Sequence, residues 1–131
     1  VWLQNYYIDI YGNTQLRGLS AYFGNTIIYG NIDNELMFVK NENTKFNVKF
    51  ENCLVKQNNY SSFSEYFTNC IYNIEPMLNA PDRMDYSLLS GSPAIDNGLL
   101  SLGKYYPIDR NGNSRILDNK PDIGALEYKV K

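Results

Sequence analysis

Phe50-Glu51-Asn52-Cys53-Leu54-Val55 is the stretch that decides the fold, and Phe67-Thr68-Asn69-Cys70-Ile71-Tyr72 repeats it 17 residues later. Each stretch has a phenylalanine, one spacer, an asparagine, a cysteine and then apolar residues. Two looser copies precede them, Leu3-Gln4-Asn5-Tyr6-Tyr7-Ile8 and Phe23-Gly24-Asn25-Thr26-Ile27-Ile28. A residue pattern that stays the same while the spacing between its copies varies is typical of a solenoid, whose coils share their strands and differ in their loops.

An asparagine at one corner of every coil suits such a solenoid. Asparagine tolerates the left-handed backbone of a sharp bend, and equivalent residues of successive coils lie about 4.8 Å apart. We therefore predict a structural ladder in which each side-chain amide donates to a neighbouring coil. Its members are Asn5, Asn25, Asn52 and Asn69.

Apolar residues beside the ladder are expected to stack like on like in columns. One column contains Phe23, Phe50 and Phe67, and another contains Ile27, Leu54 and Ile71. A corner resets the two-residue alternation of a strand, so two orientations stay open. Either residue 54 points into the coil, or residues 53 and 55 do.

Composition favours an all-β chain. The 131 residues include 18 Asn, which is typical of turns, and 12 Tyr, which with Ile, Val and Phe favours strands. This length suits one domain. We expect coils over residues 1–78 and final strands with an irregular cap over residues 79–131.

Charge and hydropathy exclude two classes of partner. Lys plus Arg is 12 and Asp plus Glu is 14, so the formal charge is 12 − 14 = −2. We expect no nucleic acid, because a phosphate-binding surface needs an excess of basic residues. We also expect no membrane span, because no apolar run is long enough.

The first residues resemble the interior of a longer chain, and a processed N-terminus would have the same appearance. Val1-Trp2-Leu3 has neither an initiator Met nor a basic region ahead of an apolar stretch, so a signal peptide is not expected. A first coil without a predecessor exposes unpaired strand edges. We therefore expect self-association through residues 1–10, or a segment that is disordered or refolded over the opening.

The repeated pattern does not continue after residue 74. Residues 75–79 and 85–89 are strand candidates around a turn at Pro81-Asp82, and residues 126–130 alternate like a last strand. Scattered Ile and Leu among Pro and Gly suit a segment that lies across the open end of the coil, where strand edges need cover.

Three motifs follow one another in this part. They are Ser90-Gly91-Ser92-Pro93-Ala94-Ile95-Asp96-Asn97-Gly98, then Ile108-Asp109-Arg110-Asn111-Gly112-Asn113-Ser114-Arg115, then Pro121-Asp122-Ile123-Gly124-Ala125-Leu126-Glu127-Tyr128. Together they closely resemble the C-terminal signature of bacterial secreted proteins with right-handed parallel β-helix (pectate-lyase-like) domains. Residues 25–31 resemble a coil of the same family, so the resemblance extends over roughly residues 20 to 128.

The resemblance implies a fold and a location. The fold is a right-handed parallel β-helix, with one coil for each of the four Asn-centred copies and an irregular C-terminal cap. The location is secreted or on the cell surface, within a larger protein, often from bacteria that degrade polysaccharides. The resemblance implies no reaction, because in this family the closing motifs finish the helix and an active site usually lies on earlier coils.

Candidate chemistry is sparse. The chain has no His and only two Cys, so a structural zinc site lacks ligands and a Ser or Cys nucleophile lacks a base. Cys53 and Cys70 stand at equivalent positions one coil apart. We favour stacked free thiols over a disulfide, because stacked Cβ atoms are about 4.8 Å apart and a disulfide prefers roughly 3.8 Å.

Asp109-Arg110-Asn111-Gly112-Asn113 has the appearance of half a calcium loop. A complete loop ends in a bidentate Glu, and none follows at the required position. Asn-Gly is also a strong turn dipeptide, so we predict a turn, without calcium or another cofactor.

Two further sets of charged residues are candidates for acid/base catalysis on a sugar. Acidic candidates stand beside Pro, Gly or a strand start, where Asp ordinarily caps turns, and are interpreted as structural. Basic candidates for a lyase lie near coil strands without acidic partners and are interpreted as solvated. The acidic set is Asp82, Asp85, Asp96 and Asp122, and the basic set is Lys40, Lys45, Lys49 and Lys56.

Tyrosines are the candidate glycan contacts, because an exposed phenol ring packs against sugars and its hydroxyl forms hydrogen bonds. The alternative is burial within the coil. The residues selected are Tyr6, Tyr7, Tyr29 and Tyr72.

Three functions compete. The first is a non-catalytic C-terminal segment of a surface β-helix protein that contacts polysaccharide. The second is part of a polysaccharide lyase or glycoside hydrolase whose catalytic coils lie upstream. The third is an adhesin or structural surface protein. We assign no catalytic residue, and we expect the isolated chain to be inactive on polysaccharides.

Overall fold

The computed structural model describes residues 1–129, which form mostly short strands and few helices. Three parallel sheets dominate, and their strands come from successive passes of the chain. The first sheet is β4-β7-β9, the second is β5-β8-β10 and the third is β1-β6. The bounds are β1 Trp2–Gln4, β4 Leu19–Gly24, β5 Ile27–Ile28, β6 Met37–Val39, β7 Phe46–Glu51, β8 Leu54–Val55, β9 Phe67–Thr68 and β10 Ile71–Tyr72.

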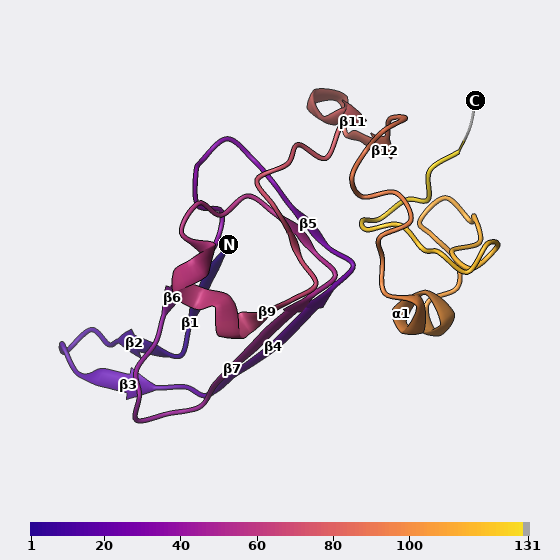
Figure 1. Cartoon of the computed structure of the whole chain (residues 1–131). Coiled ribbons are helices and arrows are strands. Elements are labelled where there is room, and N and C mark those ends of the chain that lie inside the picture. Colours follow the sequence, from indigo (N-terminus) through magenta and orange to yellow (C-terminus); the bar gives the residue numbers. More distant parts are fainter. Residues whose placement is uncertain (130–131) are drawn as a thin grey trace.

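The strands of the three sheets lie along a roughly triangular outline in Figure 1, and residues 1–74 are here called the coil. The registers agree with the predicted columns. Phe50 is the Cα partner of both Phe23 and Phe67, and Leu54 is the partner of both Ile27 and Ile71. Successive passes therefore stack residue on residue.

Left-handed asparagines form the corner between the first two sides. Asn25, Asn52 and Asn69 have φ values of 48°, 49° and 51°. The predicted bend therefore recurs three times at one corner. Asn5 follows β1 on the third side, where Gln4 pairs with Val39, so it belongs to a different corner.

The coil interior settles the open question of orientation. Cys53 and Val55 belong to the interior apolar cluster, whereas Leu54 belongs to a second cluster outside it. Phenylalanine rings stack through the interior, with centroids 4.6 Å apart from Phe23 to Phe50 and 5.0 Å apart from Phe50 to Phe67. Residues 53 and 55 thus point inward and residue 54 points outward.

The last pass replaces one side of the triangle with a helix. Between β8 and β9 the chain forms a 3-10 helix, η1 (Tyr60–Tyr66), in place of a third strand. Its Phe63 and Tyr66 pack on Phe38 of β6, with ring centroids 4.7 Å and 5.0 Å away. The coil cross-section is filled by aromatic rings there.

Residues 75–129, here called the C-terminal lobe, lie beside the coil (Figure 1). The lobe contains β11 (Leu78–Ala80), η2 (Pro81–Arg83), β12 (Asp85–Leu88) and α1 (Leu100–Tyr105). Its Leu88, Ala94 and Ile123 pack with Leu54, which is completely buried. The lobe therefore covers the outer face of the β5-β8-β10 sheet, whereas composition predicted a cap across the coil end.

Strand predictions in the lobe are confirmed in one case and wrong in another. β11 and β12 pair antiparallel around the turn at Pro81. No strand forms over residues 126–129, and Val130 lies outside the described residues. The Asp109 carboxylate accepts from Glu127 N and the Asp122 carboxylate from Tyr128 N, so these N–H groups are unavailable to a strand partner.

The N-terminal residues are ordered and paired. β1 pairs with β6, and β2 (Tyr6–Ile8) pairs antiparallel with β3 (Thr14–Leu16). This hairpin projects from the coil (Figure 1) and exposes Ile8, Ile10 and Tyr11. Refolding over the opening, one of the three outcomes expected for residues 1–10, is therefore not what the structure shows.

Candidate functional site

Two of the three corner asparagines, Asn25 and Asn52, bind the lobe, which differs from the predicted bonds between coils. Asn25 Oδ1 accepts from Leu99 N at 2.6 Å and Asn25 Nδ2 donates to Leu99 O at 3.3 Å. Asn52 Nδ2 donates to Asn97 O at 3.0 Å. The lobe backbone at residues 97–99 thus runs past the corner and pairs with its side chains. The bonds are lateral because the lobe reaches these amides from outside the coil.

Gly98 makes this close approach feasible. A Cβ at residue 98 would lie 2.7 Å from Pro121 O and 3.0 Å from Asn25 Nδ2. Any side chain would therefore push the lobe away from the corner. The glycine of the Ser-Pro-Ala-Ile-Asp-Asn-Gly motif has a packing role that the sequence did not reveal.

Asn5 has a separate role. It is completely buried, and its Nδ2 donates to Asn41 O at 2.9 Å while its Oδ1 accepts from Asn41 N at 2.7 Å. These bonds hold the loop of the next pass. Asn5 therefore stands outside the row formed by Asn25, Asn52 and Asn69, and its amide holds residue 41 of the next pass.

A groove between coil and lobe contains one of the four selected tyrosines. Its volume is about 490 Å³, within the range of small-molecule sites. Tyr29 lines it from the coil and Tyr86, with 47% of its surface exposed, lines it from β12. We call this cavity the tyrosine groove. Its lining is Tyr29, Gly30, Asn31, Glu75, Pro76, Leu78, Pro81, Asp82 and Tyr86.

Polar groups surround the two rings of the tyrosine groove. Lys56 Nζ lies 5.6 Å from the Tyr29 ring centroid and donates to Gly30 O at 3.2 Å. Glu75 and Asp82 are exposed carboxylates in the lining. Aromatic faces next to hydrogen-bonding groups suit a hydroxyl-rich ring. Sequence reasoning missed Tyr86 because nothing local links β12 to the loop after β5.

The other three selected tyrosines lie elsewhere. Tyr72 stacks on Tyr60 with centroids 4.2 Å apart, and burial raises the pKa of Tyr72 to about 12. Tyr6 and Tyr7 belong to the projecting hairpin, where the Arg17 guanidinium lies 5.4 Å from the Tyr7 ring centroid. The structure therefore does not bring the four together.

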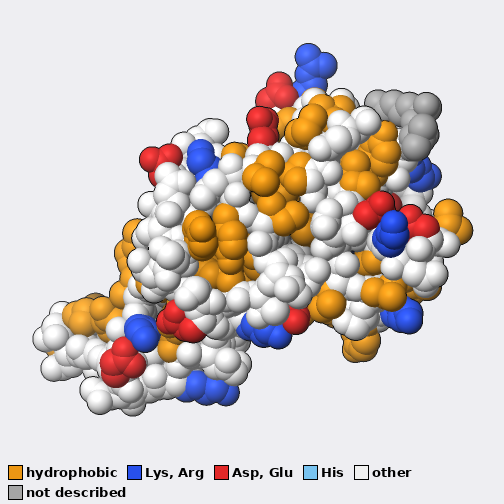
Figure 2. Space-filling model, in the orientation of Figure 1, with side chains coloured by type: hydrophobic (Ala, Val, Ile, Leu, Met, Phe, Trp, Pro, Cys, Tyr) orange, Lys and Arg blue, Asp and Glu red, His pale blue; other side chains and the backbone are white. Residues whose placement is uncertain are grey.

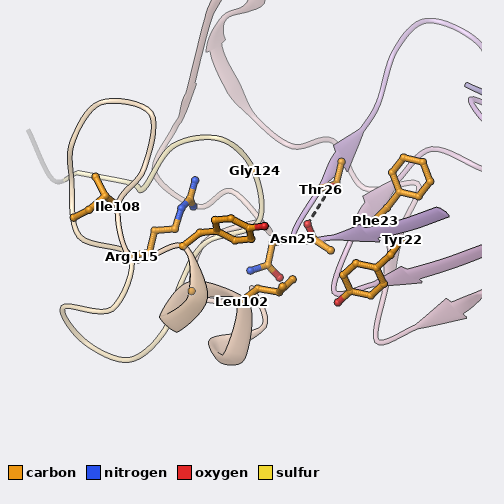
Figure 3. A pocket seen from close by; sticks show the side chains of 11 residues that line it. Tyr22, Phe23, Asn25, Thr26, Leu102, Ile108, Arg115 and Gly124 are labelled. Atoms are coloured by element: carbon orange, nitrogen blue, oxygen red, sulfur yellow. Dashed lines mark hydrogen bonds between the residues drawn. The ribbon is translucent and has the colours of Figure 1, made fainter. Parts of the chain in front are cut away.

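Two more cavities, each of about 420 Å³, flank Asn25. Tyr22, Phe23, Leu102 and Arg115 are among the residues that line the first. In Figure 3, Asn25 lies between Arg115 on one side and Tyr22 on the other, with Leu102 below it. Ile27, Leu78, Tyr86 and Ala125 are among the residues that line the second. Asn25 and Gly124 belong to both linings, so the cavities adjoin at the corner. We call them the corner cavities.

The four candidate aspartates divide into structural residues and one groove residue. Asp122 is buried and accepts from Asp96 N at 2.8 Å, while Asp85 accepts from Ser87 N at 3.0 Å. Asp82 lines the tyrosine groove. Asp85 has the bond to the second residue after it that is typical of turn capping, whereas Asp122 accepts from backbone N–H groups 6 and 26 residues away.

The turn at Asp109 is confirmed. Gly112 has a φ of 82°, and Ile108 and Ser114 form an antiparallel bridge across the turn. The carboxylate, only 5% exposed, accepts from the backbone N–H groups of residues 111, 113 and 127 and from Asn113 Nδ2. Burial alone would raise the pKa of Asp109, but these donors lower it below its ordinary value. The oxygens face N–H donors, an arrangement unsuited to calcium.

The same turn occurs in the hairpin, which sequence reasoning overlooked. Asp9-Ile10-Tyr11-Gly12-Asn13 has Asp, Gly and Asn at the same spacing. Asp9 Oδ1 accepts from Tyr11 N at 2.9 Å and from Asn13 N at 2.8 Å. The shared Asp-x-x-Gly-Asn signal therefore predicts this turn wherever it recurs.

Two of the candidate lysines have acidic partners, contrary to the sequence interpretation. Lys40 Nζ lies 3.1 Å from Glu42 Oε1, and Lys49 Nζ lies 3.0 Å from Glu51 Oε1. Glu51 Oε2 also accepts from Tyr22 Oη at 2.9 Å. Each Lys is two residues from its partner in the sequence. Residues at this spacing in an extended chain point to the same side, which brings the two charges together. Hydrogen bonds from Lys49 and Tyr22 lower the pKa of Glu51.

Cys53 and Cys70 are free thiols, as the sequence favoured. Cys53 Sγ lies 3.3 Å from Phe23 O and Cys70 Sγ lies 3.6 Å from Phe50 O. Each thiol thus contacts a backbone carbonyl of the preceding pass. Hydrogen bonding with Cys70 and burial raise the pKa of Cys53. We assign both a packing role.

Glu127 makes the stability of the lobe depend on pH. Its Oε1 lies 2.7 Å from Arg115 Nη1, and both side chains are 12% exposed. Burial, followed by repulsion from Asp122, raises the pKa of Glu127 to about 7. An acid whose folded pKa is raised stabilises the fold below its unfolded pKa and loses that contribution as pH rises through the folded pKa.

We expect the free energy of unfolding to fall by up to about 3 kcal/mol between pH 5 and pH 8 because of Glu127. Urea unfolding at the two pH values measures this. Glu127→Gln, which cannot ionise, is expected to flatten the profile in this window. If the free energy of unfolding of Glu127→Gln still fell as steeply between pH 5 and pH 8, Glu127 would not be the group responsible.

Charge on the face shown in Figure 2 is mixed, with red and blue side chains scattered between several apolar patches. Within residues 1–129, no group of three or more His, Cys, Asp or Glu side chains is placed to hold a metal. None of the helices in that range is long and apolar enough to cross a membrane. No family model matches the chain, and neither does any curated protein or solved structure.

Proposed function

We propose that this chain is the non-catalytic C-terminal segment of a secreted or cell-surface protein with a right-handed parallel β-helix, and that it contacts polysaccharide through the tyrosine groove. Stacked parallel registers at Phe50 and Leu54 support the coil. The three C-terminal motifs support the family and its location. The lobe packs Leu88, Ala94 and Ile123 on Leu54 and so covers the outer face of the β5-β8-β10 sheet.

The observation that carries polysaccharide contact is the pairing of Tyr29 and Tyr86 in one cavity. These rings come from elements 57 residues apart in the sequence, and each combines an apolar face with a hydroxyl. Asn31, Glu75 and Asp82 offer acceptors for sugar hydroxyls beside them. The two carboxylates of the lining, Glu75 and Asp82, favour neutral glycans over polyuronates.

The test is a glycan array with the full chain, followed by titration of the best neutral oligosaccharide. We expect Tyr86→Ala to weaken its binding at least tenfold, because a ring of the groove is lost. Tyr105→Ala is the matched control, since Tyr105 is 74% exposed and lines none of the cavities described above. Equal affinity in both variants, or binding to no glycan, would sink the proposal.

A further inference from the structure

A further cavity of the lobe adjoins the tyrosine groove. Its lining includes Arg110 and Asn111 from one turn and Asp85 and Ser87 from β12. We call it the arginine cavity. All of its lining residues belong to the lobe, so the lobe alone forms it. Tyr86 is the residue that lines both the arginine cavity and the tyrosine groove, so the two cavities meet there.

The size of the arginine cavity indicates a subsite of a larger site. Small-molecule sites have volumes of about 300–1,000 Å³. The tyrosine groove, at about 490 Å³, lies within this range, whereas the arginine cavity, at about 270 Å³, lies below it. Tyr86 forms a wall of both and is itself exposed. A chain of linked rings in the groove therefore reaches the arginine cavity by passing over Tyr86.

The turn that supplies Arg110 and Asn111 needs neither side chain. The equivalent turn of the hairpin has Ile10 and Tyr11 at these positions, and both are exposed. The bonds that hold each turn run from backbone N–H groups to the carboxylate of the Asp that begins it. The fold therefore leaves positions 110 and 111 open to residues that bind a ligand.

The polar groups of the arginine cavity suit sugar hydroxyls. The guanidinium of Arg110 donates hydrogen bonds and the amide of Asn111 both donates and accepts, which matches hydroxyls that do both. Asp85 is held within the lobe, since its carboxylate accepts from Ser87 N, Ser87 Oγ and Asn79 Nδ2. Its negative charge offsets the positive charge of Arg110 in the lining, so the cavity suits an uncharged ring better than an anion.

We propose that the arginine cavity is a second sugar subsite, and that this chain binds an internal stretch of a neutral polysaccharide that passes over Tyr86. The first subsite is the tyrosine groove. In the second, Arg110 and Asn111 bind the hydroxyls of a following sugar, and Leu126 of the same lining offers an apolar surface to its ring. The inference rests on the proposed function, because the groove supplies the first subsite. It adds that affinity increases with the length of the glycan.

The test is isothermal titration calorimetry of the full chain with disaccharides and tetrasaccharides. The probes are cello-, manno- and xylo-oligosaccharides, together with fragments of the neutral glycan that binds best on the array. We expect a tetrasaccharide to bind about tenfold more tightly than its disaccharide. Arg110→Ala is expected to weaken tetrasaccharide binding about tenfold and to leave disaccharide binding unchanged, because bonds from a charged donor are lost only beyond Tyr86.

A second variant and a matched control complete the set. Asn111→Ala keeps the backbone bond from residue 111 to Asp109 and is expected to weaken the tetrasaccharide about threefold. Arg83→Ala is the control, since Arg83 is exposed and lines none of the cavities described above. Thermal unfolding checks that the three variants keep the melting temperature of the parent chain.

The outcomes separate this inference from the proposed function. Equal affinities for disaccharide and tetrasaccharide, or equal tetrasaccharide affinities of Arg110→Ala and Arg83→Ala, overturn the second subsite, while weaker binding by Tyr86→Ala still supports the groove. Equal weakening of disaccharide and tetrasaccharide by Arg110→Ala would place Arg110 in the first subsite and likewise overturn the inference. Binding to no glycan overturns both proposals.

Discussion

Replacing Phe50 with alanine is expected to lower the free energy of unfolding by about 4 kcal/mol. Phe50 is completely buried, and its ring lies between Phe23 and Phe67 at centroid distances of 4.6 Å and 5.0 Å. Removal leaves a cavity that parallel strands on both sides cannot close without breaking their registers. Urea unfolding followed by far-ultraviolet circular dichroism measures the loss.

Phe23→Ala is the matched control, because it removes the same ring from the end of the stack. Phe23 is only partly buried and has a stacked ring on one side. We expect a clearly smaller loss of stability than for Phe50→Ala. Similar losses in the two variants would mean that the interior stack is not the main stabilising contact of the coil.

Asp109→Ala is expected to lower the free energy of unfolding by about 3 kcal/mol. The change leaves three part-buried backbone N–H groups and one side-chain amide without their acceptor. Each unsatisfied donor costs about 1–3 kcal/mol before relaxation and water entry reduce the sum. Glu127 N is among these donors, so the effect reaches the Arg115–Glu127 ion pair. Differential scanning calorimetry provides an independent measure.

Asp9→Ala supplies the comparison for Asp109, since the same turn lies on the projecting hairpin. Water reaches the N–H groups around Asp9 when the carboxylate is removed. We therefore expect only a small change in the melting temperature. If Asp9→Ala and Asp109→Ala lowered the stability equally, the loss of stability would be due to the turn itself and not to burial of the carboxylate.

Local features of the fold were predictable. Asn25, Asn52 and Asn69 adopt the left-handed bend, and the turn at Asn111-Gly112 forms where expected. These outcomes depend on the conformational preferences of a few consecutive residues. Asn5 was misplaced because its flanking residues imitate the repeat, although its strand pairs on another side of the coil.

The candidate site was predictable only in part. Tyr29 was selected as an exposed aromatic near a corner, but Tyr86, Glu75 and Asp82 join it only when the lobe folds back. Tyr72 was selected on the same grounds and is instead stacked on Tyr60. Sequence position does not reveal which face of a ring another element covers.

By itself, the sequence determined the repeated strand-Asn-strand unit, its like-on-like columns and the tight turns, because period and turn chemistry act over short distances. Only the tertiary structure decided that residues 53 and 55 face inward, that Leu54 is buried beneath the lobe, and that Asn25 bonds to Leu99. The physical reason is that these choices depend on burying apolar surface between segments up to 74 residues apart. The backbone of the corner allows either residue 54 or residues 53 and 55 to point inward. The choice between them depends on which apolar surface packs against the strand.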